Sequence, residues 1–123
     1  MPRKILVVED DRDVQKAIRI WLSANGYTTV SAVDAVSAIS VARNEKPDLI
    51  VLDVGLPAGD GFVVMERLQD IGDLASIPVI IVTARDPSVV LPQARRAGAR
   101  GFLRKPVDGE DLLYSISRVL KPN

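Results

Sequence analysis

Five polar side chains that carry the atoms for metal or phosphate chemistry each follow a short apolar run. They are Glu9, Asp10, Asp53, Thr83 and Lys105. Three carboxylates in one crevice repel one another, and a hard divalent cation such as Mg²⁺ removes that conflict. A Thr hydroxyl and a Lys ammonium can bind phosphoryl oxygens beside such a cation. If the fold gathers these side chains, the pattern indicates metal-assisted chemistry on phosphate.

The apolar runs mark the strands that must position these side chains. Residues 49–52 are four consecutive aliphatic residues, which is typical of a parallel strand buried on both faces, and the run stops on Asp53. The other predicted strands are 5–8, 27–33, 78–82 and 102–104. Side chains just outside the carboxyl ends of such strands are where ligands collect in an open α/β sheet.

The segments between the strands carry apolar residues at three- and four-residue spacing, which predicts amphipathic helices. The first predicted helix covers residues 13–25 and stops at Asn25-Gly26, and the second is capped by Asp34 and ends before Pro47. The third covers residues 62–71, the fourth is a stretch up to Ala97, and the last is capped by Asp108. Five strands alternating with five helices predict an α/β fold, a doubly wound five-stranded parallel sheet with helices on both faces. The flavodoxin-like strand order 2-1-3-4-5 places the first and third strands side by side, so Glu9, Asp10 and Asp53 would converge.

Length and composition narrow the possible classes of protein. The 123 residues suit a single domain, 1–123. With 16 basic and 16 acidic side chains there is no global field to attract nucleic acid or an anionic membrane. The absence of Cys and His excludes thiol nucleophiles, Cys/His zinc sites and Ser-His-Asp triads. Because the first apolar run is too short for a signal peptide or a membrane span, we expect a cytoplasmic protein that contacts neither nucleic acid nor membrane.

Each of the polar residues also has a purely structural interpretation. The acidic run 9–11 can be a solvated turn with a helix cap, and Asp53 can simply turn the chain into its loop. Thr83 can cap the following helix, and Lys105 can be an ordinary surface lysine. All of these features fall at the carboxyl ends of predicted strands one, three, four and five, and this coincidence favours the functional interpretation.

Several separated motifs resemble the receiver domains of bacterial two-component response regulators, over essentially the whole chain. The motifs are Val7-Val8-Glu9-Asp10, Leu52-Asp53 with Leu56-Pro57 and Asp60-Gly61, Val82-Thr83-Ala84, and Gly101-Phe102-Leu103-Arg104-Lys105-Pro106. The resemblance implies a signalling switch that catalyses only its own phosphorylation and dephosphorylation. Its donor would be a sensor histidine kinase, a histidine phosphotransfer protein or a small molecule such as acetyl phosphate, and its downstream partner or output domain is unknown.

The resemblance also implies a role for each site residue. Asp53 would be the phosphoacceptor, and Mg²⁺ or Mn²⁺ would be held by Glu9, Asp10, Asp53 and the backbone carbonyl of Gly55. Asp11 would cap the first helix. Further along the chain, Thr83 and Lys105 would bind the phosphoryl group, Phe102 would be the switch aromatic, and Lys105-Pro106 would be a cis peptide.

Two places in the chain depart from the common pattern. Arg100-Gly101 stand where receivers that dimerise through their fourth and fifth helices carry an acidic pair, so we do not expect that dimer. Pro92 falls five residues after the helix start at Asp86-Pro87, where it would cost about 3 kcal/mol in a straight helix. We predict that residues 87–91 fray and that a short, kinked or partly mobile helix becomes ordered on phosphorylation, with a static kink as the alternative.

Two other classes of function use some of the same residues. A phosphatase or phosphotransferase of the haloacid-dehalogenase kind also has an Asp nucleophile and Mg²⁺, but it needs a second acid two residues later, where this chain has Gly55. Turnover of an external phosphomonoester would distinguish it. A pseudo-receiver that only binds a partner is disfavoured, because the acids, Thr83 and Lys105 are all present.

Overall fold

The structure, a computed structural model, describes residues 2–55 and 61–121. Its elements are β1 (Lys4–Val8), α1 (Arg12–Ala24), β2 (Thr28–Ala32), α2 (Ala35–Glu45), β3 (Leu49–Asp53), α3 (Gly61–Gln69), the 3₁₀ turn η1 (Gly72–Leu74), β4 (Val79–Thr83), α4 (Pro87–Arg96), β5 (Gly101–Arg104) and α5 (Gly109–Leu120). The expected motif residues Leu56, Pro57 and Asp60 lie outside the described residues. No helix in the described part of the chain is long and apolar enough to cross a membrane.

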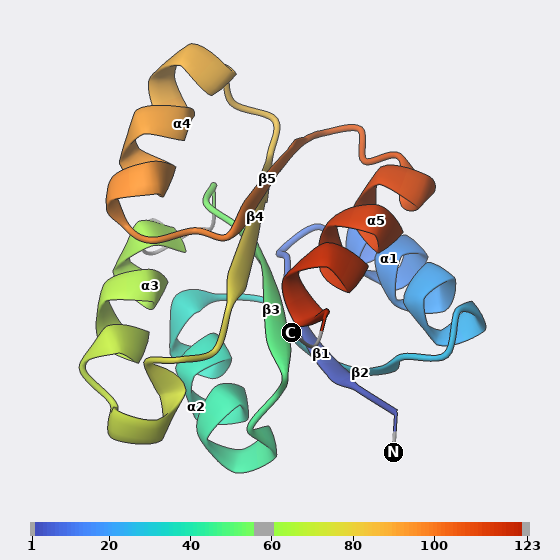
Figure 1. The fold of residues 1–123 in the computed structure, drawn as a ribbon, viewed down its shortest axis with the longest axis horizontal. Helices are drawn as coiled ribbons and strands as arrows, with labels where there is room; N and C mark the ends of the chain where they lie inside the picture. Colours follow the sequence, from blue (N-terminus) through green and yellow to red (C-terminus); the bar gives the residue numbers. More distant parts are fainter. Residues whose placement is uncertain (1, 56–60, 122–123) are drawn as a thin grey trace.

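The five strands form one parallel sheet in the order β2-β1-β3-β4-β5, which confirms the predicted topology. Figure 1 shows α1 and α5 on one face of the sheet and α2, α3 and α4 on the other. The strands β1 and β3 are neighbours although α1, β2 and α2 separate them in the chain. The carboxyl ends of β1 and β3 therefore meet at the centre of one edge of the sheet.

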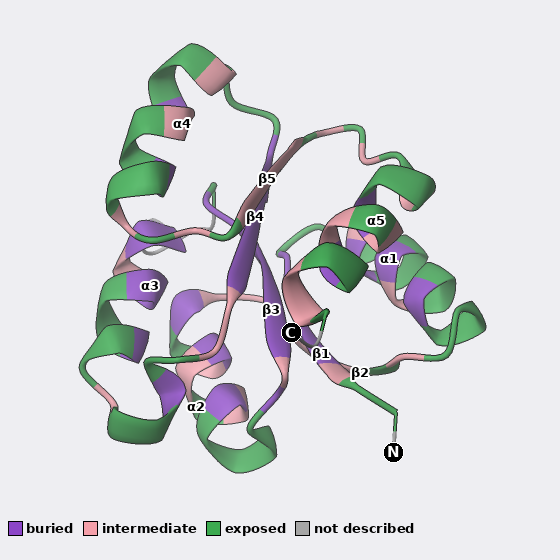
Figure 2. Cartoon of the chain, viewed as in Figure 1, coloured by how far each residue is buried: buried purple, intermediate pink, exposed green. Residues whose placement is uncertain are grey.

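Alternation along each strand divides the core into two layers. Ile5 and Val7 of β1 pack with α1 and α5, whereas Leu6 and Val8 pack with the helices of the other face. Every residue of β3 is buried, as expected for a strand covered on both sides, and Figure 2 shows the central strands as the buried middle of the molecule. The result is a fully buried central strand that carries Asp53 at its end.

Aspartate caps start four of the helices. The carboxylates of Asp11, Asp34, Asp86 and Asp108 each accept hydrogen bonds from amides in the first turn of the helix that follows. Asp11 is thereby confirmed as a cap. The helix α1 ends at Ala24 with Asn25 as its C-cap, and Gly26 then takes a φ of 92°, a conformation that favours glycine.

The helix α4 begins five residues earlier than predicted. It runs continuously from Pro87 to Arg96 with Pro92 inside it, so the expectation that residues 87–91 fray is wrong. Asp86 accepts hydrogen bonds from the amide and the hydroxyl of Ser88, both at 2.9 Å, and Val90 anchors the first turn in the core. Ser88 is exposed, so water can solvate the carbonyl that Pro92 leaves without its amide donor. Capping and burial together outweigh the cost of the proline.

Candidate functional site

The register of the sheet brings the polar strand ends to one level. Val8 pairs with Leu52, so Glu9 is level with Asp53. Asp53 in turn pairs with Val82, one residue before Thr83. Thr83 is opposite Arg104, and the amide of Lys105 donates to the Thr83 carbonyl at 2.9 Å. Strand pairing alone therefore gathers side chains from four strands that are distant in the sequence.

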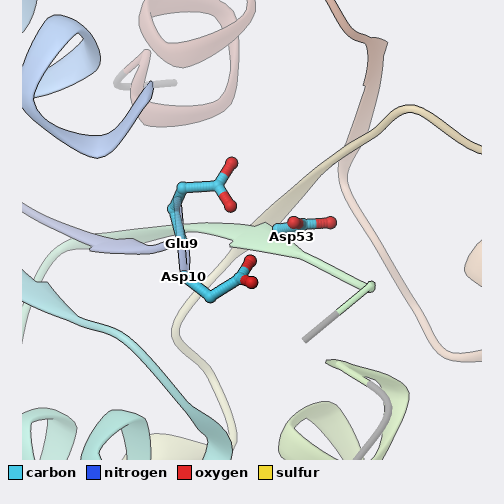
Figure 3. A group of neighbouring side chains, drawn as sticks. All are labelled: Glu9, Asp10 and Asp53. Atoms are coloured by element: carbon cyan, nitrogen blue, oxygen red, sulfur yellow. The ribbon is translucent and has the colours of Figure 1, made fainter. Parts of the chain in front are cut away.

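Three carboxylates form a compact cluster at this edge. Glu9, Asp10 and Asp53 each contribute one oxygen, and these oxygens all lie within 4.8 Å of one another. Figure 3 shows Glu9 and Asp10 just beyond the end of β1, beside Asp53 at the end of β3. Glu9 is 2% exposed and Asp53 7%, whereas Asp10 is exposed to solvent. The cluster is open on the side of Asp10.

The ammonium of Lys105 lies between two of these carboxylates. Its Nζ pairs with Oε1 of Glu9 and, at 3.2 Å, with Oδ2 of Asp53. The peptide bond between Lys105 and Pro106 is cis. The lysine thus supplies one positive charge against three acidic groups, which leaves the cluster net negative.

Burial and neighbouring charges shift the pKa values of Glu9 and Lys105. Burial raises the pKa of Glu9 from 4.5 to about 7, and Asp53 raises it as well, while Lys105 opposes both effects. Burial lowers the pKa of Lys105, but its pairing with Glu9 and Asp53 outweighs this and the net shift is upward. The ammonium therefore stays charged, and the carboxyl group of Glu9 resists ionising, as expected for repelling acids without a cation.

Two glycines shape the space around Asp53. The amide of Gly55 donates to Oδ1 of Asp53 at 2.8 Å, which orients the carboxylate. A Cβ at Gly61 would lie 2.6 Å from Cα of Val54 and 2.7 Å from the Asp53 carbonyl oxygen. Only glycine allows the start of α3 to approach the end of β3 this closely.

Thr83 and Phe102 lie on the face of the sheet opposite to Lys105. Thr83 is 1% exposed, and its hydroxyl accepts a hydrogen bond from the amide of Arg85 at 3.2 Å. Phe102 is half-buried and packs with the core layer of α2, α3 and α4, whereas Leu103 packs with α1 and α5. By strand alternation Lys105 shares the face of Leu103, and Thr83 shares the face of Phe102.

Sequence reasoning missed two contacts that hold the site together. The side chain of Gln15 is buried on α1 and donates to the carbonyls of Glu9, at 3.1 Å, and Ala32, at 3.0 Å. Its spacing of three from Ile18 placed it on the buried stripe and was the available signal. The second contact joins Nε1 of Trp21 to the carbonyl of Gly109 at 2.9 Å, close to the segment that follows Lys105, and no local pattern indicates it.

The donor set fits a hard divalent cation. Carboxylate oxygens from two strand ends, two of them largely buried and one open to solvent, match the ligands and the water access that Mg²⁺ prefers. Gly55 follows Asp53 closely enough for its carbonyl to complete such a set, and this role remains an expectation.

The chain is similar to known proteins over nearly its whole length. Residues 5–117 match the model of the response regulator receiver domain. A response regulator MprA from a Mycobacterium species (strain KMS) is 40% identical over 121 residues, which are 98% of this chain and 52% of MprA. The chain thus spans about half the length of the curated relatives it matches.

Solved structures show the same fold. A putative response regulator from Chloroflexus aurantiacus superposes with a TM-score of 0.92 at 28% identity and covers 99% of this chain and 100% of its own. The receiver domain of the sensor histidine kinase PA1611 from Pseudomonas aeruginosa gives a TM-score of 0.87 at 26% identity, covering 96% and 97% of the two chains. That structure has a magnesium ion coordinated in its active site cleft.

Proposed function

This chain belongs to the response regulator receiver domains of two-component systems, and from that membership we propose that it is switched by phosphorylation of Asp53. One observation carries the proposal. The Asp53 carboxylate ends the central strand, is oriented by the amide of Gly55, and lies against the Lys105 ammonium in a cluster with two more acids. The donor is a phosphohistidine of a sensor kinase or phosphotransfer protein, or a small acyl phosphate.

In the proposed reaction an oxygen of the Asp53 carboxylate attacks phosphorus. The bond from phosphorus to the histidine nitrogen, or to the carboxylate oxygen of acetyl phosphate, breaks, and the leaving group keeps the electron pair. A neutral imidazole departs from a phosphohistidine whose other ring nitrogen carries a proton, or an acetate ion departs from acetyl phosphate, and Asp53 becomes an acyl phosphate. Because the transition state of such transfers is loose, the protein contributes mainly position and charge.

The other residues of the site serve this transfer. Glu9, Asp10 and Asp53 would hold Mg²⁺, which when bound supplies charge neutralisation for the phosphoryl oxygens. Lys105 exchanges its contact with Oδ2 of Asp53 for one with a phosphoryl oxygen. The Thr83 hydroxyl, which now accepts from Arg85, turns to donate to another phosphoryl oxygen.

The response of the domain follows from the movement of Thr83. Thr83 and Phe102 share one face of the sheet, so a shift of Thr83 toward Asp53 frees space into which Phe102 can turn. Two packings of β4, α4 and β5 then exchange populations, and the phosphoryl group favours one of them. A downstream protein or output domain that distinguishes these packings completes the signal.

Labelling with acetyl phosphate tests the proposal. In the presence of Mg²⁺, intact mass measurement should show one added phosphoryl group, sensitive to base and absent from Asp53→Asn. An Asp70→Asn variant, which changes an exposed acid elsewhere, should be labelled like the wild type. Labelling that survives in Asp53→Asn or in excess chelator would overturn the assignment, and steady turnover of an external phosphomonoester would indicate a phosphatase instead.

A further inference from the structure

The strand β2 forms one edge of the sheet and pairs with β1 on one side only. The amide of Thr28 donates at 2.9 Å, and the carbonyl of Ala32 accepts at 3.1 Å, in hydrogen bonds with backbone groups that flank β1. Backbone groups of successive strand residues point to opposite sides, so those of Thr29 and Ser31 point away from β1. Among the described residues, no strand covers that side.

The free edge of β2 therefore offers the amides and the carbonyls of Thr29 and Ser31. In the part of the chain that the structure describes, no other backbone or side-chain group forms a hydrogen bond with them. Unpaired donors and acceptors along a strand are a template on which an extended peptide can add a further strand. The edge can thus bind a second chain through its backbone.

A basic hollow lies beside this edge. It has a volume of about 300 Å³ and is lined by Lys16, Arg19, Ile20 and Ser23 of α1 and by Thr29 of β2. The α1 residues recur at spacings of three and four, so they share one face of the helix. Figure 1 shows α1 and β2 on the opposite side of the molecule from α4.

The two cations of the basic hollow are available to a ligand. Nε of Arg19 donates to Oγ1 of Thr29 at 3.3 Å, which holds the guanidinium against the edge strand. Between described residues, the other guanidinium nitrogens and the Lys16 ammonium form no hydrogen bond or salt bridge, and no acidic side chain lines the hollow. The net charge of the chain is zero, so this positive charge is local, and it is complementary to carboxylates.

We propose that an extended segment of a partner protein adds a strand to the free edge of β2 and places an acidic side chain in the basic hollow. Its backbone pairs with Thr29 and Ser31, and its carboxylate binds Arg19 and Lys16. Ile20, which is 59% exposed, contacts an apolar side chain two positions from the acid, because alternate side chains of a strand lie on one face.

Two other occupants fit this surface less well. A symmetric dimer that joins two β2 edges would bring the basic hollows of both copies to one interface, without an acidic side chain in either lining. A phosphate group of a nucleic acid would use the cations of the hollow. It would leave the backbone groups of Thr29 and Ser31 unpaired.

Peptide display with counter-selection tests the proposal. A library of random peptides is panned against the full chain, and peptides that also bind the Ser31→Pro variant are removed. Proline removes an amide at the free edge and keeps the bonds from β2 to β1, so the melting temperature should stay unchanged. If it falls, Arg19→Glu replaces Ser31→Pro in the counter-selection. We expect the retained peptides to share an acidic and an apolar residue two positions apart.

Amide hydrogen exchange locates the bound peptide. Exchange at Thr29 and Ser31 should slow on binding, because their amides gain acceptors, whereas the amide of Val30 already points to β1 and should keep its rate. Methylation of the peptide amides that face the edge should weaken binding roughly tenfold, since each loses a hydrogen bond. Methylation of the intervening amides should have a smaller effect.

Charge variants test the basic hollow. Lys16→Glu and Arg19→Glu should each weaken peptide binding about threefold to tenfold. Arg96→Glu changes an exposed arginine on α4 and should leave the affinity unchanged.

Four results would each overturn the proposal: no peptide retained after counter-selection, retained peptides without an acidic residue, unchanged exchange at Thr29 and Ser31, or a dimer that Ser31→Pro dissociates. Peptide affinity is measured on the unphosphorylated chain. A failure of Asp53 labelling is therefore distinguishable from a failure of this proposal.

Discussion

The ammonium of Lys105 pairs with the carboxyl group of Glu9 inside the site, where only 2% of Glu9 is exposed. The pairing does not suffice to keep Glu9 ionised at neutral pH, because burial and Asp53 raise its pKa to about 7. The metal-free site is thus poised between a protonated and an ionised state close to neutral pH.

The raised pKa of Glu9 predicts that the stability of the metal-free protein depends on pH. The folded state holds a proton on Glu9 up to about pH 7, whereas the unfolded chain releases it near the ordinary value of 4.5. The folded state therefore binds more protons between these values, and its stability falls as pH rises, by up to about 3 kcal/mol. Denaturant unfolding in chelator from pH 5 to pH 8 should show this fall, and Glu9→Gln should flatten it. As a control, Glu66→Gln changes an exposed site and should keep the wild-type dependence of unfolding free energy on pH. The same pH dependence in wild type and Glu9→Gln would contradict the prediction.

Magnesium should stabilise the protein through the same cluster. A cation held by Glu9, Asp10 and Asp53 relieves their repulsion and binds only the folded state, so the melting temperature should rise with Mg²⁺ concentration. Asp10→Asn should abolish most of that rise. Asp11→Asn is the matched control, because it removes a neighbouring charge while Asn still caps α1. A rise in Asp10→Asn equal to that in Asp11→Asn would place the cation elsewhere.

Gly61→Ala should disturb both stability and labelling. The added Cβ would lie 2.6 Å from Cα of Val54 and 2.7 Å from the Asp53 carbonyl oxygen, and backbone atoms cannot move aside cheaply. We expect a loss of about 1–3 kcal/mol in unfolding free energy and slower phosphorylation of Asp53. Gly72→Ala meets no atom within 4 Å and should cost less than about 0.5 kcal/mol. Similar stabilities for the two variants would mean that the approach of α3 to β3 is not tight.

Pro92→Ala should stabilise α4. The substitution restores an amide that can donate to the carbonyl of Ser88, and removes the crowding of that turn, for a gain of about 1–3 kcal/mol. Pro87→Ala, at the first helical position, should change stability little because the amide there has no helical acceptor. Amide hydrogen exchange over residues 89–97 should slow in Pro92→Ala alone; unchanged exchange would mean that the helix already accommodates the proline without loss.

Local interactions and strand topology were predictable from the sequence. The caps Asp11, Asp34 and Asp108 are short-range, since each carboxylate reaches amides two or three residues ahead. The convergence of the acids follows from parallel pairing, because Glu9 and Asp53 each end a strand and the two strands are neighbours. The caps were predictable from residue type at the helix starts, and the convergence of the acids was predictable from residue type at the strand ends.

Contacts that depend on packing were not predictable in this way. The bond between Trp21 and Gly109 joins residues 88 positions apart, and it exists only because α1 and the start of α5 are brought together. The proline rule failed at Pro92 for a related reason. The rule considers only the hydrogen bond that proline removes. It does not include the burial of Val90 or the cap that Asp86 provides, and both stabilise this turn.

Strand alternation puts Glu9, Asp53 and Lys105 on the side of α1 and α5, and Thr83 with Phe102 on the side of α4. An evolutionary consequence follows. If the proposed function holds, mutations around α1 would affect the approach of the phosphoryl donor, whereas mutations around α4 would affect the downstream protein, and Thr83 would link the two faces. On this proposal, a duplicated copy of the domain could acquire a new downstream partner and keep its phosphoryl donor. It could equally acquire a new donor and keep its downstream partner.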